Sequence, residues 1–171
     1  MFLSFDQQIV ELFASLRNPI LTYFMKDVSF LGSSVFIFLL IIGFYVFKKR
    51  HTDSWKLSIA FFLSVISSIG LKYIFARPRP ELAIYSGIFY AFPSTHATLG
   101  FSIAYVLCDI YKHKSKAKFY FYSIAILIAI SRVYLGVHYF TDVLFGSLLG
   151  ILIGFLVVKC FNKYGYFCEL T

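Results

Sequence analysis

Charged residues are scarce in this chain of 171 residues. Asp, Glu, Lys and Arg together make up 14% of the sequence, whereas about 25% is usual for a soluble domain. Apolar residues account for 60% of the chain and aromatic residues for 21%. This composition argues against an ordinary soluble domain, and the length allows one domain at most.

Acidic residues are the scarcer charged class, with 8 against 16 basic residues and a net charge of +8. A basic balance can indicate nucleic-acid binding. Here the basic residues lie between long apolar runs, so basic loops beside membrane spans explain the charge more simply. We therefore expect a membrane protein that has no nucleic-acid partner.

Cysteine is also rare, and its only positions are Cys108, Cys160 and Cys168. The count is odd, and none lies in a loop that we predict below to face outward, so a disulfide framework is not expected. The spacings of cysteine and histidine do not suit a metal site. We expect neither a metal nor another cofactor, and nothing in the sequence indicates an obligate protein partner.

Long apolar runs predict the fold. A helix needs about 20 apolar residues to cross the hydrocarbon core of a bilayer. Five runs approach that length, at residues 29–47, 55–75, 95–111, 119–137 and 139–161. We therefore predict an all-α fold, a polytopic membrane helix bundle with about five transmembrane helices.

The N-terminal part of the chain is less apolar than these runs. Its first stretch has apolar residues at helical spacing with polar residues between them, and Asn18-Pro19 interrupts the pattern. We interpret residues 1–30 as helices that lie at the membrane interface, and the alternative is a sixth, imperfect span. Residues 31–161 then form the transmembrane core of one integral-membrane domain, 1–171.

Loop charges predict the orientation. With five spans, three basic groups fall on one side, which should be cytoplasmic because short cytoplasmic loops are rich in lysine and arginine. These groups hold ten of the 16 basic residues: Lys48, Lys49, Arg50 and Lys56; Lys112, Lys114, Lys116 and Lys118; Lys159 and Lys163. The opposite, outer side then carries all three of the polar strings described next.

Three short polar strings lie beside the apolar runs. They are Lys72-(six residues)-Arg79-Pro80, Pro93-Ser94-Thr95-His96 and Ser131-Arg132-(five residues)-His138-(three residues)-Asp142. Ionisable groups at a membrane edge are costly unless they are paired or used, so they are candidates for function. Together the strings supply three cations, two histidines and one carboxylate, which are the groups expected of a metal-free phosphate-ester hydrolase.

The last string suggests a nucleophile. His138 and Asp142 are four residues apart and share one face of a helix. A carboxylate on one imidazole nitrogen fixes the tautomer and leaves the other nitrogen free to attack. Arg132 can hold phosphate oxygens with parallel hydrogen bonds. The alternative for this string alone is a helix-end salt bridge between Arg132 and Asp142.

The middle string predicts a helix start with an acid in its first turn. Pro93-Ser94 is typical of a helix N-terminus with Ser94 or Thr95 as the cap. Such an end binds anions through its free N–H groups. His96 would then lie where it can protonate a leaving alkoxide. A plain capped helix start explains Ser94 but not an ionisable His96.

The first string adds two cations. Phosphoryl transfer depends mostly on positioning and on stabilising the charge of the phosphate oxygens. Lys72 and Arg79, together with Arg132, can offset a phosphate dianion without a metal. Arg77 is not assigned: pairing with Glu81, binding to lipid head groups and exposure to solvent are all open, and we do not expect it to be catalytic.

In order, spacing and residue types, the strings resemble the signature of the type 2 phosphatidic acid phosphatase superfamily. The resemblance covers residues 72–142 in the motifs and about 20–160 in the layout of spans. It implies a helical core with a nucleophile at His138, oriented by Asp142, and a general acid at His96. The phosphate binders that it implies are Lys72, Arg79, Ser94, Thr95 and Arg132. Thr95 departs from the pattern, which usually has glycine there, although its backbone N–H remains available.

The resemblance implies a membrane-embedded lipid phosphatase that forms a phosphohistidine, in a bacterial inner membrane with its site on the outer face. A site there can receive the phosphate of a lipid whose tails stay in the bilayer. The candidate substrates are phosphatidylglycerophosphate, phosphatidic acid, undecaprenyl diphosphate and lipid A 1-phosphate. Aromatic residues typical of the interface lie in the connection at residues 82–92, namely Tyr85, Phe89, Tyr90 and Phe92.

Two other functions remain open. A phosphohistidine can pass its phosphoryl group to a lipid or sugar acceptor instead of water, as in a lipid-linked phosphotransferase. A membrane protein can also keep the fold without catalysis. Loss of a motif residue would indicate that case, and no motif residue is lost.

Overall fold

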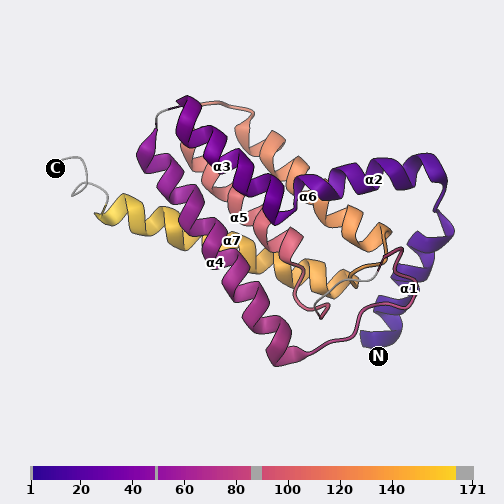
Figure 1. Ribbon diagram of the computed structural model, residues 1–171. Helices are drawn as coiled ribbons and strands as arrows, with labels where there is room; N and C mark the ends of the chain where they lie inside the picture. The colour runs from indigo at the N-terminus through magenta and orange to yellow at the C-terminus, as the bar shows by residue number, and fades with distance from the viewer. Residues whose placement is uncertain (1, 49, 86–89, 165–171) are drawn as a thin grey trace.

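A computed structural model of the chain describes residues 2–48, 50–85 and 90–164. Within these ranges the structure has seven α-helices and no β-strand, which confirms the all-α prediction (Figure 1). The helices are α1 (Phe2–Ser15), α2 (Pro19–Leu31), α3 (Ser34–Lys48), α4 (His51–Phe75), α5 (Thr95–Ile110), α6 (Ala117–Tyr134) and α7 (Phe140–Tyr164). Lys49, Phe89 and Cys168, which entered the sequence argument, lie outside the described residues.

Three helices are long and apolar enough to cross a membrane: α4, α6 and Phe140–Lys163 of α7. Helices α2 and α3 pass the same test only as a pair, which is bent by 51°. Helix α5 has 16 residues and α3 has 15, so each is shorter than the length of about 20 residues that crosses a bilayer. Of the five expected runs, three correspond to the long helices α4, α6 and α7. The run at residues 29–47 lies within the bent pair, and the run at residues 95–111 forms the shorter α5.

Helices α1 and α2 form the helical N-terminal part that the sequence predicts, with the expected break at Asn18-Pro19. The Asn18 side chain accepts a hydrogen bond of 2.9 Å from the Leu21 N–H, and Pro19 begins α2. Both features favour a helix start at this point. Helix α1 packs against α6 and α7 at one end of the bundle (Figure 1). The position of α1 and α2 relative to a bilayer stays a prediction.

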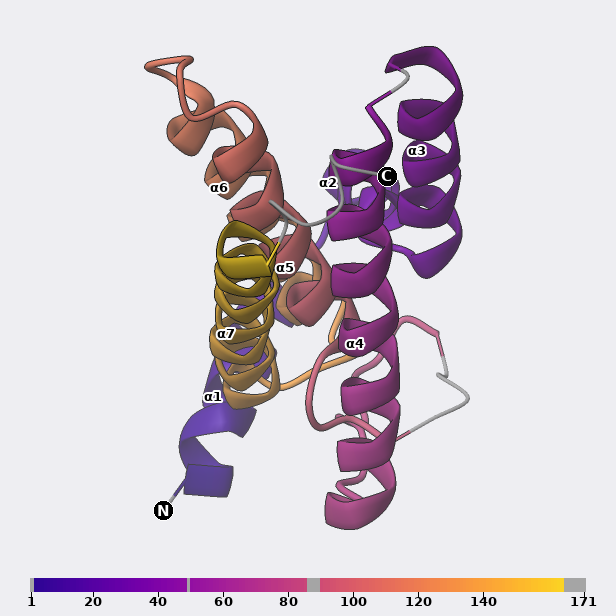
Figure 2. The same ribbon diagram turned by 90° about the vertical axis from the view of Figure 1, so that its left-hand side faces the viewer.

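Helix α5 lies at the centre of the bundle, in contact with α4, α6 and α7 (Figure 2). Its approach to α7 is close because α7 presents glycines there. A Cβ atom at Gly146 would lie 2.7 Å from the Ser94 carbonyl oxygen, and one at Gly154 would lie 2.6 Å from Tyr105 Cβ. Small residues allow helix backbones to come this near to each other.

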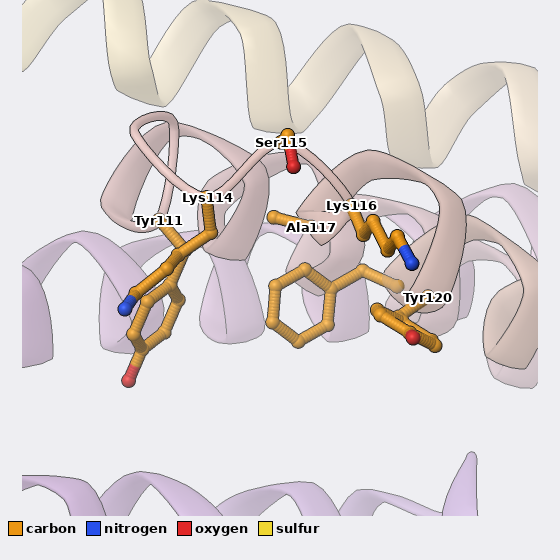
Figure 3. Close-up of a pocket in the computed structure, with 7 residues that line it drawn as sticks. Tyr111, Lys114, Ser115, Lys116, Ala117 and Tyr120 are labelled. Atoms are coloured by element: carbon orange, nitrogen blue, oxygen red, sulfur yellow. The ribbon is translucent and has the colours of Figure 1, made fainter.

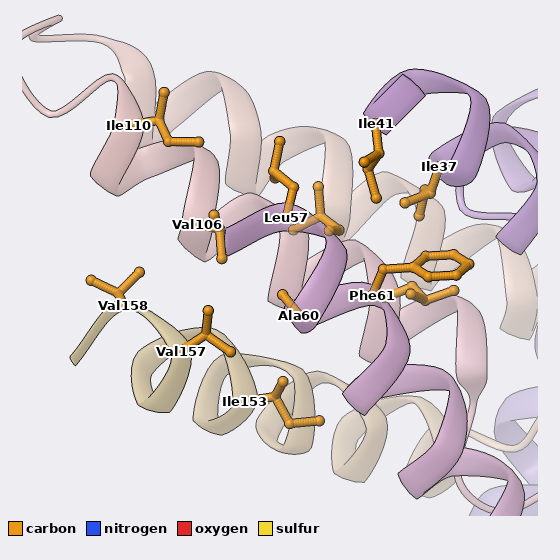
Figure 4. Packing of buried hydrophobic residues seen from close by; sticks show 12 residues of the cluster. Ile37, Ile41, Leu57, Ala60, Phe61, Val106, Ile110, Ile153, Val157 and Val158 are labelled. Carbon is orange, nitrogen blue, oxygen red and sulfur yellow. The ribbon is translucent and has the colours of Figure 1, made fainter. Parts of the chain in front are cut away.

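An apolar core joins α3, α4, α5 and α7. It lies farther from the polar strings along these helices. Leu57 and Val106 are buried in it, with Ile153 and Val157 of α7 beside them (Figure 4). On the outer faces of the helices, in contrast, large apolar side chains are exposed, such as Ile74 at 75%. Such a surface suits contact with lipid tails rather than water.

Candidate active site

The residues of the three polar strings meet at one end of the bundle. Lys72 near the end of α4 binds the Pro93 carbonyl oxygen just before α5, and the Ser94 N–H binds the Asp142 carbonyl oxygen in the first turn of α7, so these helix ends lie together. The eight expected site residues lie at these ends, at the end of α6 or in the connections between them: Lys72, Arg79, Ser94, Thr95, His96, Arg132, His138 and Asp142.

His138 lies in the connection between α6 and α7, and only 2% of it is exposed. Its Nε2 is 3.5 Å from Nη1 of Arg79, and its Nδ1 is 3.7 Å from Oδ2 of Asp142. Burial lowers the pKa of His138 well below its usual range, and the positive charges of Arg132, Lys72 and Arg79 lower it further. Both effects favour the neutral imidazole, which is the form that can act as a nucleophile.

The turn before His138 depends on a glycine. Gly136 has a φ of 68°, a left-handed conformation that side chains other than hydrogen disfavour. A Cβ there would also lie 2.7 Å from the Leu82 carbonyl oxygen. The short turn at Gly136 brings His138 back toward Arg132, so the six-residue spacing of the last string places both in one site.

Asp142 is completely buried, and its arginine partner is Arg77. Nη1 of Arg77 donates a hydrogen bond of 2.6 Å to Oδ1 of Asp142, and Nη2 donates one of 2.7 Å to Oδ2 of Asp6. Oδ2 of Asp142 accepts a hydrogen bond of 2.9 Å from the Tyr139 N–H. The sequence left three environments open for Arg77: pairing with Glu81, contact with lipid head groups, or solvent. The structure shows a fourth, in which Arg77 pairs with both Asp142 and Asp6.

Lys72 is buried and holds the connection that leads into α5. Its Nζ donates hydrogen bonds to the carbonyl oxygens of Tyr90 at 2.8 Å, Ala91 at 3.2 Å and Pro93 at 2.7 Å. An ammonium group has three N–H donors, so all three are used within the protein. Lys72 therefore positions the backbone next to Ser94, and a direct bond from Lys72 to phosphate stays a prediction.

Arg132 is 4% exposed and faces side chains from two distant parts of the chain. Its Nη1 donates hydrogen bonds to the hydroxyl of Tyr85, at 2.7 Å, and to Oγ of Ser29 in α2. Among the described residues it forms no ion pair with Asp142, so the helix-end salt bridge that the last string left open is not formed. Tyr85, expected only as an interface aromatic, is part of the site.

The start of α5 falls where the middle string predicts it. Ser94 occupies the N-cap position and Thr95 begins the helix, with His96 next. The Ser94 side chain, however, makes no capping hydrogen bond. The backbone N–H of Ser94 instead donates a hydrogen bond of 3.0 Å to the Asp142 carbonyl oxygen. This bond joins the start of α5 to the start of α7.

Several buried polar atoms at this place have no hydrogen-bond partner within the described part of the chain. Three of them are Oγ of Ser94, Nε of Arg132 and Nδ1 of His138. Unpartnered buried polar groups are costly and uncommon in folded proteins. The Ser94 hydroxyl and the Arg132 N–H are suited to bind an anion such as phosphate, whereas Nδ1 of His138 faces Oδ2 of Asp142.

A pocket at the opposite end of α5 and α6 contains none of these residues. It has a volume of about 380 Å³ and is lined by Lys114 and Lys116 of the α5–α6 connection and by aromatic side chains from that connection and from the first turn of α6 (Figure 3). The Lys116 and Tyr120 side chains extend to the same side of that connection (Figure 3). This end of the bundle carries the lysines that we expect to face the cytoplasm, so the chemistry and the basic loop are well separated.

Comparison with known proteins identifies the family. The family model described as "PAP2 superfamily" matches residues 53–166. The chain is 36% identical, over 90% of its length and 82% of the relative, to phosphatidylglycerophosphatase B of Bacillus subtilis. The chain belongs to the PAP2 superfamily.

Solved structures of PAP2 proteins resemble this fold over most of its length. The crystal structure of the transmembrane PAP2 type phosphatidylglycerolphosphate phosphatase from Bacillus subtilis has a TM-score of 0.85, with 33% identity over 95% of this chain and 87% of that chain. The structure of LpxE from Aquifex aeolicus has a TM-score of 0.80, with 31% identity over 89% and 93%. A lipid A 4'-phosphatase of Porphyromonas gingivalis is 29% identical over 85% of this chain and 68% of the relative.

The protein is therefore an integral membrane PAP2 lipid phosphatase, a phosphoric ester hydrolase. The matched region contains α4 to α7 with all eight expected site residues. It does not contain Asp6 or Ser29, which bind Arg77 and Arg132. Sequence reasoning missed both. The signal for Asp6 was a carboxylate in an amphipathic segment beside the membrane, where an ionisable group must find a partner.

Proposed function

We propose that the protein hydrolyses the phosphate of a membrane lipid through a phosphohistidine at His138. The position of His138 supports this most directly: it is buried and neutral, with Arg79 on its Nε2 side and Asp142 on its Nδ1 side. A neutral imidazole with one nitrogen facing a carboxylate is a nucleophile. The nitrogen that attacks is Nε2, because Nδ1 faces Asp142.

In the first step, Nε2 of His138 attacks phosphorus. The bond from phosphorus to the lipid oxygen breaks as the nitrogen–phosphorus bond forms, and His96 gives a proton to the leaving oxygen. Burial and the nearby cations disfavour a charged His96, so this role requires the negative charge of the bound phosphate to keep it protonated. Asp142 stabilises the positive charge that develops on the imidazole ring.

Cations and backbone donors balance the charge on the phosphate oxygens. Arg79 and Arg132 provide guanidinium N–H groups, and Ser94 and Thr95 provide a hydroxyl and backbone N–H groups at the start of α5. Lys72, bound to the backbone just before Ser94, adds positive charge next to the start of α5. Such an arrangement does the work for which many phosphatases use a metal.

In the second step, water attacks the phosphohistidine. His96, which lost its proton in the first step, accepts a proton from that water. The phosphorus–nitrogen bond breaks, inorganic phosphate leaves, and the imidazole of His138 is neutral again. Both steps conserve the protons, so the enzyme returns to its starting state.

The proposed lipid is phosphatidylglycerophosphate. The similarity to phosphatidylglycerophosphatase B and to the Bacillus subtilis phosphatase structure supports this choice. Phosphatidic acid, undecaprenyl diphosphate and lipid A 1-phosphate are the other candidates. A cleft of about 320 Å³ lies beside Arg79, between α1 and the connection at residues 78–82, and offers space for a polar head group next to the reacting phosphate.

We further propose that the site opens on the outer face of a bacterial inner membrane. The support is the separation of the site from the lysine loop at the far ends of α5 and α6. Cytoplasmic loops are the ones rich in lysine and arginine. A site on the other face then meets lipid phosphates of the outer leaflet.

The experiment is phosphate release from a panel of the four lipid phosphates by the purified full-length protein in detergent. We expect release from phosphatidylglycerophosphate at the highest rate, loss of release in His138→Ala, and unchanged release in Lys114→Ala, which alters the distant lysine loop. Transfer of phosphate to an added acceptor lipid without release would favour a phosphotransferase. Equal, low release by the wild type and His138→Ala would overturn the proposal.

A further inference from the structure

Helix α1 brings a buried carboxylate to the edge of the site. Asp6 is completely buried. Its Oδ2 accepts hydrogen bonds from Nη2 of Arg77 at 2.7 Å and from Oγ1 of Thr141 at 2.5 Å, and its Oδ1 accepts one of 3.1 Å from the Thr141 N–H. Burying a carboxylate is costly unless its oxygens are satisfied. Here the partners of Asp6 are Arg77, which also binds Asp142, and Thr141, which precedes Asp142 in the chain.

Arg77 lies between two carboxylates. One terminal nitrogen binds Asp6 and the other binds Asp142, at 2.7 Å and 2.6 Å. The guanidinium also lies over the ring of Tyr139, 4.2 Å from its centroid, and Nη1 donates to Thr141 Oγ1 at 2.7 Å. These contacts fix the plane of the guanidinium, so Arg77 presents a rigid pair of donors.

The contacts of Arg77 decide which oxygen of Asp142 faces the nucleophile. Oδ1 of Asp142 binds Arg77, and Oδ2 faces Nδ1 of His138 while it accepts the Tyr139 N–H. Without Arg77, Oδ1 of Asp142 loses its hydrogen bond, and only the Tyr139 N–H still limits rotation of the carboxylate about its last side-chain bond. The orientation of a catalytic histidine depends on the carboxylate behind it, so a rotated Asp142 would leave His138 poorly oriented.

We propose that Asp6 and Arg77 are positioning residues of the hydrolytic site. Asp6 holds Arg77 against Asp142, and Arg77 turns the second oxygen of Asp142 toward His138. Activity therefore requires α1 in its docked place. This inference rests on the proposed function of His138. The competing view is that Asp6 and Arg77 only fasten α1 to the bundle and affect stability alone.

The test uses purified full-length Asp6→Asn, Arg77→Gln and Arg77→Lys proteins. Nitrophenyl phosphate and a short-chain phosphatidic acid are the substrates. We expect kcat to fall about 10-fold or more in each of the three variants, up to the loss caused by Asp142→Asn itself, because all three act through Asp142. KM should change little, and the loss should be equal on both substrates, because the defect is in the nucleophile and not in the departure of the leaving group.

A double variant separates positioning from fastening. In an Asp142→Asn background, Arg77→Gln should cause little further loss of kcat, because the carboxylate that it orients is already gone. If the two losses multiply, or if the single variants keep the wild-type kcat, the inference is wrong. The matched control is Asp109→Asn, which breaks the half-buried ion pair with Lys56, 3.0 Å long, at the other end of the bundle. It should lower thermal stability at most and leave kcat unchanged.

The outcomes also distinguish this inference from the proposed function. Activity that survives in His138→Ala would overturn the proposed function. An inactive His138→Ala with fully active Asp6→Asn and Arg77→Gln would overturn the positioning role alone. If Arg77→Gln does not fold, Asp6→Asn changes one atom and keeps the shape of the side chain. A normal kcat in that variant, with a normal melting temperature, is then sufficient to reject the inference.

Discussion

Nδ1 of His138 lies 3.7 Å from Oδ2 of Asp142, farther than a hydrogen bond allows. Both side chains are almost fully buried, so no solvent screens the charge between them. As phosphorus bonds to the ring, the imidazole becomes positive and attracts the carboxylate. We expect the two atoms to close to hydrogen-bond distance at that stage, with Arg77 holding the other oxygen in place.

The first prediction concerns this pair. His138→Ala should abolish turnover, because it removes the nitrogen that attacks phosphorus. Asp142→Asn should reduce kcat by about a hundredfold or more, because the amide no longer selects the correct tautomer. Phosphate release by purified, folded variants is the measurement. Substantial release by His138→Ala would rule out the assigned nucleophile.

The second prediction concerns His96 and the leaving group. A lipid alkoxide needs a proton to depart, whereas nitrophenolate hardly does. His96→Ala should therefore reduce hydrolysis of a lipid phosphate by about a hundredfold more than hydrolysis of nitrophenyl phosphate. The decline of activity at alkaline pH should also disappear, because that decline reports loss of the proton from the acid. Equal losses on both substrates would mean that His96 chiefly binds phosphate.

The third prediction concerns metals. Among the described residues, no group of three or more His, Cys, Asp and Glu side chains is placed to hold a metal ion, and three cations are available near His138. Activity should therefore persist in a chelator, and vanadate should inhibit by taking the place of the phosphate on His138. Phosphate release with and without chelator, and with increasing vanadate, is the measurement. A strict requirement for Mg²⁺ or Zn²⁺ would contradict the mechanism.

The fourth prediction concerns topology. A cysteine introduced at the exposed Glu81, in a background without the native cysteines, should react with an impermeant thiol reagent added to intact cells. A cysteine at the exposed Ser115 is the matched control, and it should react only after the cells are opened. The opposite pattern would place the lysine loop outside and the substrate in the inner leaflet.

Local sequence patterns were enough to predict the helices and to identify the three polar strings as parts of one site. His138 and Asp142 are four residues apart, and Ser94 directly precedes a helix, so short spacing alone brings these groups near the site. The break at Asn18-Pro19 was visible for the same reason. Helix α5, at Thr95–Ile110, also follows the predicted run at residues 95–111 closely, because Pro93-Ser94 marks its start. The apolar run at residues 29–47, in contrast, did not reveal that it is divided between α2 and α3, which meet at a bend of 51°.

Contacts between distant segments were not predictable from one sequence. Arg77 and Asp6 are 71 positions apart, and Arg132 and Ser29 are 103 apart. The charge of Arg77 suited Glu81, lipid and water equally well, so only the docking of α1 decides its partner. Lys72 shows a similar limit, because its three bonds to backbone oxygens depend on the path of residues 90–93.

The glycine face of α7 has a consequence for how such enzymes diversify. The Gly146 backbone lies against the Ser94 carbonyl, and the Ser94 N–H is bonded to the Asp142 carbonyl oxygen at 3.0 Å. Side chains of α5 such as Tyr105 pack directly on this glycine face, so a larger residue in place of Gly146 or Gly154 would push α5 and α7 apart. Mutations at the rim, where α1 meets the connection at residues 78–82, do not separate Ser94 from Asp142. The choice of lipid is thus free to evolve at the mouth of the site while the reacting centre stays fixed.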